Sequence, residues 1–203
     1  MTYYECIALL ASRWTDELVV TSAGTSSELW YNITGNTEQV FYLEASMSLS
    51  SMFAAGIAYG VTDKHIWAFS GDGAFVMNAG MLAVEQQMAL PNFKHFLISN
   101  RVYGSTSDVP LPGRKNNDYE GIARAFGIKR VYSFSKLDEL KNNFDKAVLD
   151  PGYSFIHLEV EPVSERFGSP PLDGPELKFR FGRNIEKVSN KKVFSGQLND
   201  ERN

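Results

Sequence analysis

Short apolar runs alternate with longer helical stretches along most of the chain. The apolar runs are rich in β-branched and aromatic residues, as is typical of buried strands, and they lie at 18–20, 40–43, 66–69, 93–99 and 155–160. Stretches of helical length lie between them, at 26–31, 46–59, 77–89, 119–126 and 137–149. Strands separated by whole helices pair in parallel through right-handed crossovers. The pattern therefore predicts an α/β fold, a three-layer sandwich with a mostly parallel sheet.

The composition changes after Val163, so we expect a domain at 1–163 and a polar tail at 164–203. The tail carries eight Lys and Arg against six Asp and Glu, with Gly and Pro punctuation and few apolar residues. Two interpretations stay open: a partly disordered tail, or an arm that orders against a partner chain. The apolar contacts of such an arm would be Phe179, Phe181 and Val193.

The balance of charges and the cysteine content exclude several classes of protein. The 203 residues include 20 Lys and Arg against 24 Asp and Glu, a net charge of −4, whereas nucleic acids and anionic membranes attract basic surfaces. No apolar run approaches the roughly 20 residues of a membrane span, and residues 1–10 lack the basic flank of a signal peptide. The single Cys6 excludes an intramolecular disulfide and a cysteine-ligated cluster. We therefore expect a cytoplasmic protein whose partners include neither nucleic acid nor membrane.

The most informative motif is Gly71-Asp72-Gly73, which directly follows the strand at 66–69. It lies at the carboxyl edge of the predicted sheet, where open α/β folds bind ligands. The glycines let the backbone approach a ligand, and the helix that follows offers free N–H groups to an anion. Asp72 beside a phosphate calls for Mg²⁺, and Asn100 ends the next strand and would lie next to Asp72. The sequence therefore predicts a site for a metal and a diphosphate, built from a carboxylate, an amide oxygen and a backbone carbonyl.

Two other phosphate-binding motifs do not fit this stretch. A dinucleotide fingerprint needs a third glycine three residues after Gly73, where Val76 stands. A P-loop needs Gly-Lys-Ser or Gly-Lys-Thr, which the chain lacks. A turn without a ligand is the simple alternative for Gly-Asp-Gly alone, but the position of Asn100 favours the site.

The spacing from Gly71-Asp72-Gly73 to Asn100 resembles the thiamine diphosphate motif. Further stretches are similar to the diphosphate-binding domain of the 2-oxo acid decarboxylases, most of all the sulfopyruvate and phosphonopyruvate decarboxylase group: 23–29, 41–48, 77–82 and 103–106. The resemblance covers about residues 18–162. It implies the thiamine diphosphate-binding fold, thiamine diphosphate and Mg²⁺ as cofactors, and decarboxylation of a short 2-oxo acid.

The resemblance also assigns roles to individual residues. Mg²⁺ would be coordinated by the side chains of Asp72 and Asn100 and by the carbonyl of Val102. The aminopyrimidine would contact the carbonyl of Ala45, and Met47 would bind the ring through its N–H and wedge beneath the cofactor. The other cofactor-binding residues, mainly around the diphosphate, would be Gly24, Thr25, Gly71, Gly73, Ala74 and Tyr103.

The chain lacks one part of the site that the resemblance implies. In this family a Glu from a separate pyrimidine-binding domain activates the cofactor, and this chain has no room for such a domain. Glu44 lies on the strand that should contact the opposite edge of the ring, so we assign it no catalytic role. We therefore expect half of an active site without a catalytic residue of its own, in a hetero-oligomer with a pyrimidine-binding subunit, as in the sulfopyruvate enzymes that are split into two chains.

Departures from the family pattern keep other functions open. The chain has Ala45-Ser46-Met47-Ser48 where the family commonly has Gly-Ser-Met-Gly, Ser99 where Asn or Asp is frequent, and Ser107-Asp108 where Gly and Gln usually follow. The alternatives are a carboligase subunit similar to acetolactate synthase, the cofactor subunit of a 2-oxo acid:ferredoxin oxidoreductase whose cluster lies on a partner, and a non-catalytic structural or regulatory homologue. Candidates for binding a substrate carboxylate or sulfonate are Arg101 and the pair Arg114-Lys115.

Overall fold

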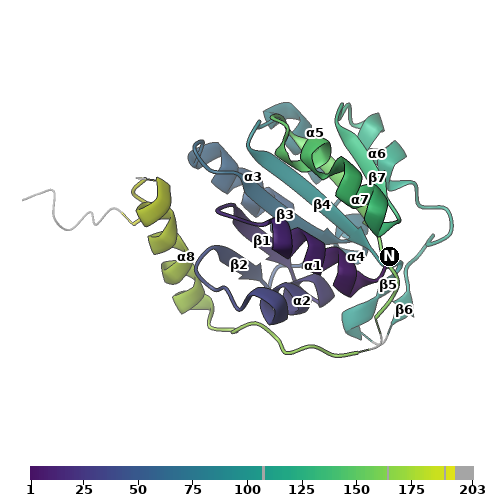
Figure 1. Cartoon of the computed structure of the whole chain (residues 1–203), viewed down its shortest axis with the longest axis horizontal. Coiled ribbons are helices and arrows are strands. Elements are labelled where there is room, and N and C mark those ends of the chain that lie inside the picture. The colour runs from purple at the N-terminus through teal and green to yellow at the C-terminus, as the bar shows by residue number, and fades with distance from the viewer. Residues whose placement is uncertain (107, 164, 190, 195–203) are drawn as a thin grey trace, which may run out of the picture.

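Six strands form the central sheet, in the order β2-β1-β3-β4-β8-β7 (Figure 1). The computed structural model describes residues 1–106, 108–163, 165–189 and 191–194. The six strands are β1 (Leu18–Ser22), β2 (Val40–Leu43), β3 (Ile66–Gly71), β4 (Phe93–Ser99), β7 (Val131–Phe134) and β8 (Ser154–Glu159).

The pairing of these strands confirms the predicted α/β fold. Neighbours in the sheet are parallel throughout, and the five predicted strands are all present. The short edge strand β7 was not predicted from the sequence, because its four residues are flanked by polar ones on both sides. After β4 the chain also forms a small antiparallel pair, β5 (Val102–Tyr103) and β6 (Val109–Pro110).

Helices cover both faces of the sheet and complete the three layers (Figure 1). One face carries α1 (Tyr3–Arg13), α2 (Thr25–Thr34) and α7 (Leu137–Phe144), which continues into a π-helical turn at Asp145–Leu149. The other face carries α3 (Ser50–Gly60), α4 (Asp72–Met77), α5 (Met81–Met88) and α6 (Tyr119–Ala125). No helix within the described residues has both the length and the apolar character needed to cross a membrane.

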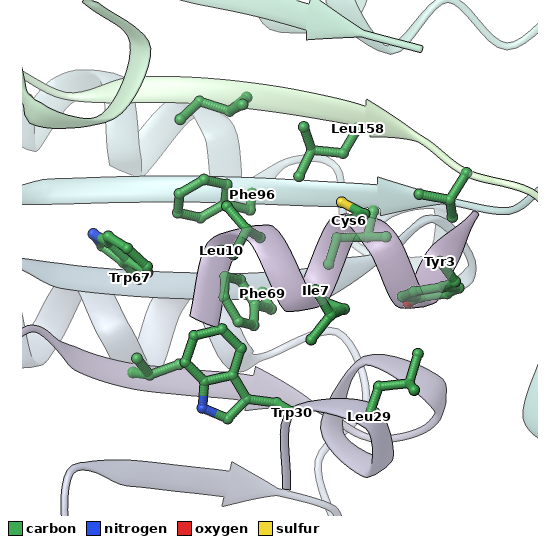
Figure 2. Close-up of a cluster of buried hydrophobic side chains, with 14 of the residues drawn as sticks. Tyr3, Cys6, Ile7, Leu10, Leu29, Trp30, Trp67, Phe69, Phe96 and Leu158 are labelled. Carbon is green, nitrogen blue, oxygen red and sulfur yellow. The ribbon is translucent and has the colours of Figure 1, made fainter. Parts of the chain in front are cut away.

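The helix α1 packs on the sheet through one apolar stripe. It begins at a capping box, in which Thr2 and Glu5 satisfy each other's backbone N–H groups. Its apolar residues then recur at helical spacing. Figure 2 shows Tyr3, Cys6, Ile7 and Leu10 of α1 lying over the sheet and beside α2. The same cluster contains Trp67, Phe69, Phe96 and Leu158 of the sheet and Leu29 and Trp30 of α2.

Two of the predicted helices have different bounds in the structure. The stretch predicted at 46–59 becomes helical only at Ser50, because Ala45–Leu49 forms a turn in which Ser48 has a positive φ of 76°. The stretch predicted at 77–89 is split between α4 and α5 by Asn78-Ala79-Gly80, residues that favour turns. The first of these two helices, α4, begins at Asp72, inside the Gly-Asp-Gly motif.

The tail contains a helix that packs on the chain's own sheet. The helix α8 (Gly174–Ser189) lies beside β2 (Figure 1), and the ring of its Phe181 is 5.4 Å from that of Phe41. Phe181 is thus a core residue rather than the partner contact that the sequence suggested, because apolar residues spaced four apart make one buried stripe along α8. Phe179 and Val193 stay exposed, and residues 164, 190 and 195–203 lie outside the described part of the tail.

The order of the strands creates a switch point between β1 and β3. The chain leaves β1 through α2 on one face to reach β2, and it leaves β3 through α4 and α5 on the other face to reach β4. Connections that diverge in this way leave a crevice at the carboxyl ends of the strands, where α/β proteins bind ligands. The topology therefore places the Gly-Asp-Gly motif at the crevice.

Candidate cofactor site

One pocket at the switch point contains most of the predicted site residues. It is lined by the loops that follow β1, β3 and β4 and by Met47 from the loop after β2. The structure brings together every predicted metal ligand and all but one of the predicted cofactor residues: Gly24, Thr25, Met47, Gly71, Asp72, Gly73, Ala74, Asn100, Val102 and Tyr103.

Ala45 is the exception among the predicted residues. It lines a neighbouring, mostly apolar cavity of about 350 Å³ between the end of β2 and the 171–177 segment. The turn that delays the start of α3 separates Ala45 from Met47, so the two side chains open onto different cavities. The structure therefore does not place Ala45 in the pocket that holds the other residues.

Asp72 is a buried carboxylate at the floor of the pocket, with 2% of its surface exposed. Its Oδ1 accepts a hydrogen bond from the Gly73 N–H (2.9 Å), and its Oδ2 accepts from the Ser99 hydroxyl (2.8 Å) and the Arg101 N–H (2.6 Å). Burial raises the pKa of Asp72, while these three donors act in the opposite direction. A cation in the pocket would compensate the cost of burying this charge.

The loop after β4 turns sharply beside Asp72. Arg101 has a left-handed backbone conformation with φ of 59°, which directs its N–H toward Asp72. Asn100 is largely buried, and its Oδ1 accepts a hydrogen bond from the Val102 N–H (3.2 Å). Within the described residues no three His, Cys, Asp or Glu side chains cluster. A metal ion at Asp72 would therefore rely on amide and carbonyl oxygens, which suit Mg²⁺.

The helix α2 supplies a second set of polar groups. It begins at Thr25 after Gly24, whose φ is 105°, and no side chain caps its first turn. Its first N–H groups are therefore available to an anion in the pocket, and the helix dipole favours negative charge at this end. The donor set as a whole fits a diphosphate bridged to a hard metal ion.

The segment after Val102 lies across the pocket. A Cβ atom at Gly73 would lie 2.5 Å from the ring of Tyr103, so only glycine allows this contact. At Gly104 a Cβ would lie 3.2 Å from the Thr25 hydroxyl and 3.3 Å from the Asn100 amide, so these loops are in close contact. The remaining cavity is about 50 Å³, enough for a metal ion with a water or two. A diphosphate would require the segment at 103–105 to move outward.

Two further residues at the site were not predicted from the sequence. Ser99 holds Asp72 through its hydroxyl, and its place at the end of β4 directly before Asn100 could have indicated this contact. Tyr3 of α1 lines the pocket and is buried there. Burial raises the pKa of the Tyr3 hydroxyl, and the nearby charge of Asp72 adds to the effect. No motif marks Tyr3, because α1 reaches the site only through the packing of the fold.

Arg101, predicted as a candidate for substrate binding, connects two loops in the structure and lines a cavity beside them. Its Nε donates to Glu159 (3.0 Å) and its Nη1 donates to the carbonyl of Arg114 (2.7 Å). Its guanidinium charge is thus partly neutralised. Arg114 and Lys115 line an open cavity of about 710 Å³ that also borders Asn100 and Val102. Ser107, part of the departure from the family pattern, lies outside the described residues.

An α/β domain that gathers free helix N–H groups, a buried carboxylate and amide oxygens at its switch point is a phosphate- and metal-binding domain. Comparison with known proteins narrows this class. The sequence model described as "Thiamine pyrophosphate enzyme, C-terminal TPP binding domain" matches residues 24–158, and the chain belongs to this family. The match confirms the resemblance seen in the sequence, with its fold and its thiamine diphosphate cofactor.

The share of each relative that the chain covers differs among three similar proteins. Sulfopyruvate decarboxylase subunit beta from Methanococcus maripaludis is 32% identical over 187 residues, which cover 92% of this chain and 99% of that one. Sulfopyruvate decarboxylase from Methanosarcina acetivorans is 28% identical over 90% of this chain, but the match covers 46% of that longer protein. Benzoylformate decarboxylase from Polynucleobacter necessarius superposes with a TM-score of 0.65 at 17% identity, over 84% of this chain and 34% of that one, a likeness of fold alone.

Proposed function

We propose that this chain is the diphosphate- and Mg²⁺-binding subunit of a cytoplasmic, thiamine diphosphate-dependent enzyme that decarboxylates a short 2-oxo acid. Sulfopyruvate or phosphonopyruvate, or an acid like them, is the proposed substrate. The observation that carries the proposal is the meeting of Asp72, Asn100 and the α2 N-terminus in one pocket. The proposal is supported by the 32% identity to a decarboxylase subunit, which extends along nearly the whole length of that subunit.

The residues of this chain would bind and orient the cofactor. Mg²⁺ would be held by the Asp72 carboxylate, the Asn100 amide oxygen and the Val102 carbonyl. The N–H groups of Ala74 and Thr25 would hold the diphosphate, with Gly73 and Gly24 beside them. When bound, thiamine diphosphate supplies a carbon nucleophile for the 2-oxo acid and a sink for the electrons left by CO₂.

Met47 lies at the open side of the pocket and is partly exposed, a position suited to support the ring from below. For Ala45 to bind the aminopyrimidine, the ring would have to extend past Met47 into the neighbouring cavity.

A second chain would supply the carboxylic acid that activates the cofactor. The chain spans nearly all of a beta subunit but under half of a single-chain sulfopyruvate decarboxylase. The remaining half of such a protein is the size of another α/β domain. In this chain Glu44 is engaged with Ser27, which agrees with its having no catalytic role. The proposed enzyme is therefore a hetero-oligomer whose site is completed by a pyrimidine-binding subunit.

The surface of α3, α4 and α5 is the proposed contact for that subunit. Residues 45–62 and 73–84 contain no charged residue, although these helices have one face toward solvent. A surface helix normally presents charged residues on its outer face, so this uncharged face is typical of one covered in an assembly. Met47, which lines the pocket, lies at the edge of this surface. The other exposed apolar side chains of the surface are Leu49, Phe53, Tyr59, Val76, Met77 and Val84.

The proposal is tested on the complex purified with Mg²⁺ and thiamine diphosphate. Asp72→Ala should reduce cofactor binding by at least about a hundredfold and abolish CO₂ release from sulfopyruvate and phosphonopyruvate, because the metal loses its charged ligand. The exposed Asp63→Ala should change neither. Phe53→Glu should remove the second chain from the complex without unfolding this one.

Other outcomes would favour the alternatives. Retained Mg²⁺-dependent binding in Asp72→Ala would contradict the site. Condensation of two 2-oxo acids in place of simple CO₂ release would indicate a carboligase. An assembly that binds no cofactor would indicate a structural or regulatory homologue.

A further inference from the structure

Glu44 makes a contact that the proposed mechanism does not use. It directly follows β2 and is half-buried. Its Oε1 accepts a hydrogen bond from the hydroxyl of Ser27, which is fully buried in the first turn of α2. The Ser27 hydroxyl also lies 3.0 Å from the hydroxyl of Thr21 on β1. The contact therefore joins the end of β2 to the end of β1 through side chains.

The two segments joined in this way diverge from neighbouring strands. Ser22 and Leu43 are partners in the parallel pair β1–β2. Beyond them, 23–25 leads into α2 on one face of the sheet and 45–49 leads toward α3 on the other. We call 23–25 the diphosphate loop and 45–49 the ring loop, after the parts of the cofactor that they would contact. Beyond the last ladder pair, Glu44 directly precedes the ring loop and Ser27 follows the diphosphate loop within the first turn of α2, so their hydrogen bond links the residues that flank the two loops.

The surroundings of Glu44 show that this link has a cost. Burial raises the pKa of Glu44, and the charge of Glu28 acts in the same direction, while the Ser27 hydroxyl and the Gly24 N–H oppose it. A partly desolvated carboxylate costs free energy, and hydrogen bonds such as that from Ser27 offset part of the cost. Both loops also contain left-handed backbone, at Gly24 (φ 105°) and at Ser48 (φ 76°), which persists only where the surroundings hold it.

We propose that Glu44 is a positioning residue that fixes the spacing between the diphosphate loop and the ring loop. The inference rests on the proposed function, since it assumes a ligand that spans both loops. A ligand that contacts both needs the correct spacing, whereas one that contacts the diphosphate loop alone does not. Glu44 therefore matters for thiamine diphosphate and not for inorganic pyrophosphate.

The test compares these two ligands on the purified complex with Mg²⁺. Glu44→Ala should weaken thiamine diphosphate binding by about tenfold, the effect of losing one hydrogen bond to a charged group, and change pyrophosphate binding less than about twofold. Ser27→Ala should have the same or a smaller effect, because the Gly24 N–H stays on Glu44, and the double variant should be no worse than Glu44→Ala alone. Glu44→Gln should restore most of the affinity, since its amide oxygen can accept from Ser27.

The exposed Glu38→Ala, on the approach to β2, is the matched control and should change neither affinity. Equal loss of both ligands in Glu44→Ala, or no loss of either, would overturn the inference.

Hydrogen exchange on the cofactor-free protein gives a second readout that needs no ligand. Glu44→Ala should speed amide exchange in both the diphosphate loop and the ring loop, while Glu38→Ala should not. Unchanged exchange in the diphosphate loop would overturn the inference. If the wild-type complex binds pyrophosphate but no thiamine diphosphate, the proposed function fails, and hydrogen exchange still decides whether Glu44 links the loops.

Discussion

At the amino ends of the strands buried polar groups are satisfied within the chain, whereas at the carboxyl ends they face a pocket. Near the amino end of β4, Asn92 donates to the carbonyls of Ala58, Val61 and Lys64. Close by, the ammonium of fully buried Lys94 donates to the carbonyls of Asp150 (2.7 Å) and Gly152 (2.6 Å). These contacts close the loops at this end of the sheet.

The carboxyl ends of the same strands carry the opposite features. Asp72 is a buried carboxylate there. Four non-glycine residues among those described have a positive φ, and three of them lie in the loops at these ends: Ser48, Arg101 and Asp108. One sheet thus separates stability from function, because backbone strain collects where a ligand would relieve it. The two ends should therefore respond differently to substitution.

The largest expected effect on stability lies at the amino ends. Asn92→Ala should reduce the free energy of unfolding by about 2–3 kcal/mol, because several buried carbonyls lose their donor. Urea denaturation of the cofactor-free chain measures the change. Asn143→Ala, on the exposed face of α7, should cost under about 0.5 kcal/mol. Similar losses for the two variants would remove the distinction between the ends of the sheet.

A second prediction concerns the pH dependence of stability at the same end. Burial lowers the pKa of Lys94 to about 8, and the charge of Arg130 contributes. Below pH 8 the folded chain therefore bears the full cost of burying the ammonium form. This cost decreases as the pH rises from 8 toward the pKa of an unfolded lysine, about 10.4. Relative to Lys94→Met, the wild type should gain about 1–3 kcal/mol between pH 7 and pH 10. A difference in urea midpoints that does not change with pH would contradict this.

The smallest expected effect lies at the carboxyl ends. Ser48→Gly should stabilise the chain by about 0.5 kcal/mol, because glycine adopts positive φ without the steric cost that serine bears. Ser46→Gly, at a position without positive φ, should destabilise it by a similar amount. Thermal unfolding of both variants measures the difference. A loss of stability in Ser48→Gly would show that the serine side chain itself holds the ring loop.

Much of the fold and part of the site could be predicted because the signals are local. The strands are continuous apolar runs, and Gly71-Asp72-Gly73 with Asn100 sits where two such runs end. The departure at Ser48 from the glycine common in the family also has a physical counterpart, the positive φ found there.

What could not be predicted depends on contacts between distant parts of the chain. Tyr3 reaches the pocket only because α1 packs over the sheet. Tyr103 was expected at the site, but its contact with Gly73 depends on the path of the loop after β4. The burial of Phe181 follows from β2 lying at the edge of the sheet, which the order of elements alone does not reveal. Arg101 looks available in the sequence, but its partner Glu159 comes from β8.

The helix α8 also has a consequence for the tendency of the chain to aggregate. An edge strand presents unpaired N–H and C=O groups that can template pairing with another copy, the first step toward aggregation. In this chain β2 is such an edge, and α8 lies beside it, held by Phe181 and by a hydrogen bond from Arg180 to the carbonyl of Thr37 (3.0 Å). The segment that reads as a polar tail thus shields an open sheet edge, so that copies of the folded chain are kept from pairing through β2.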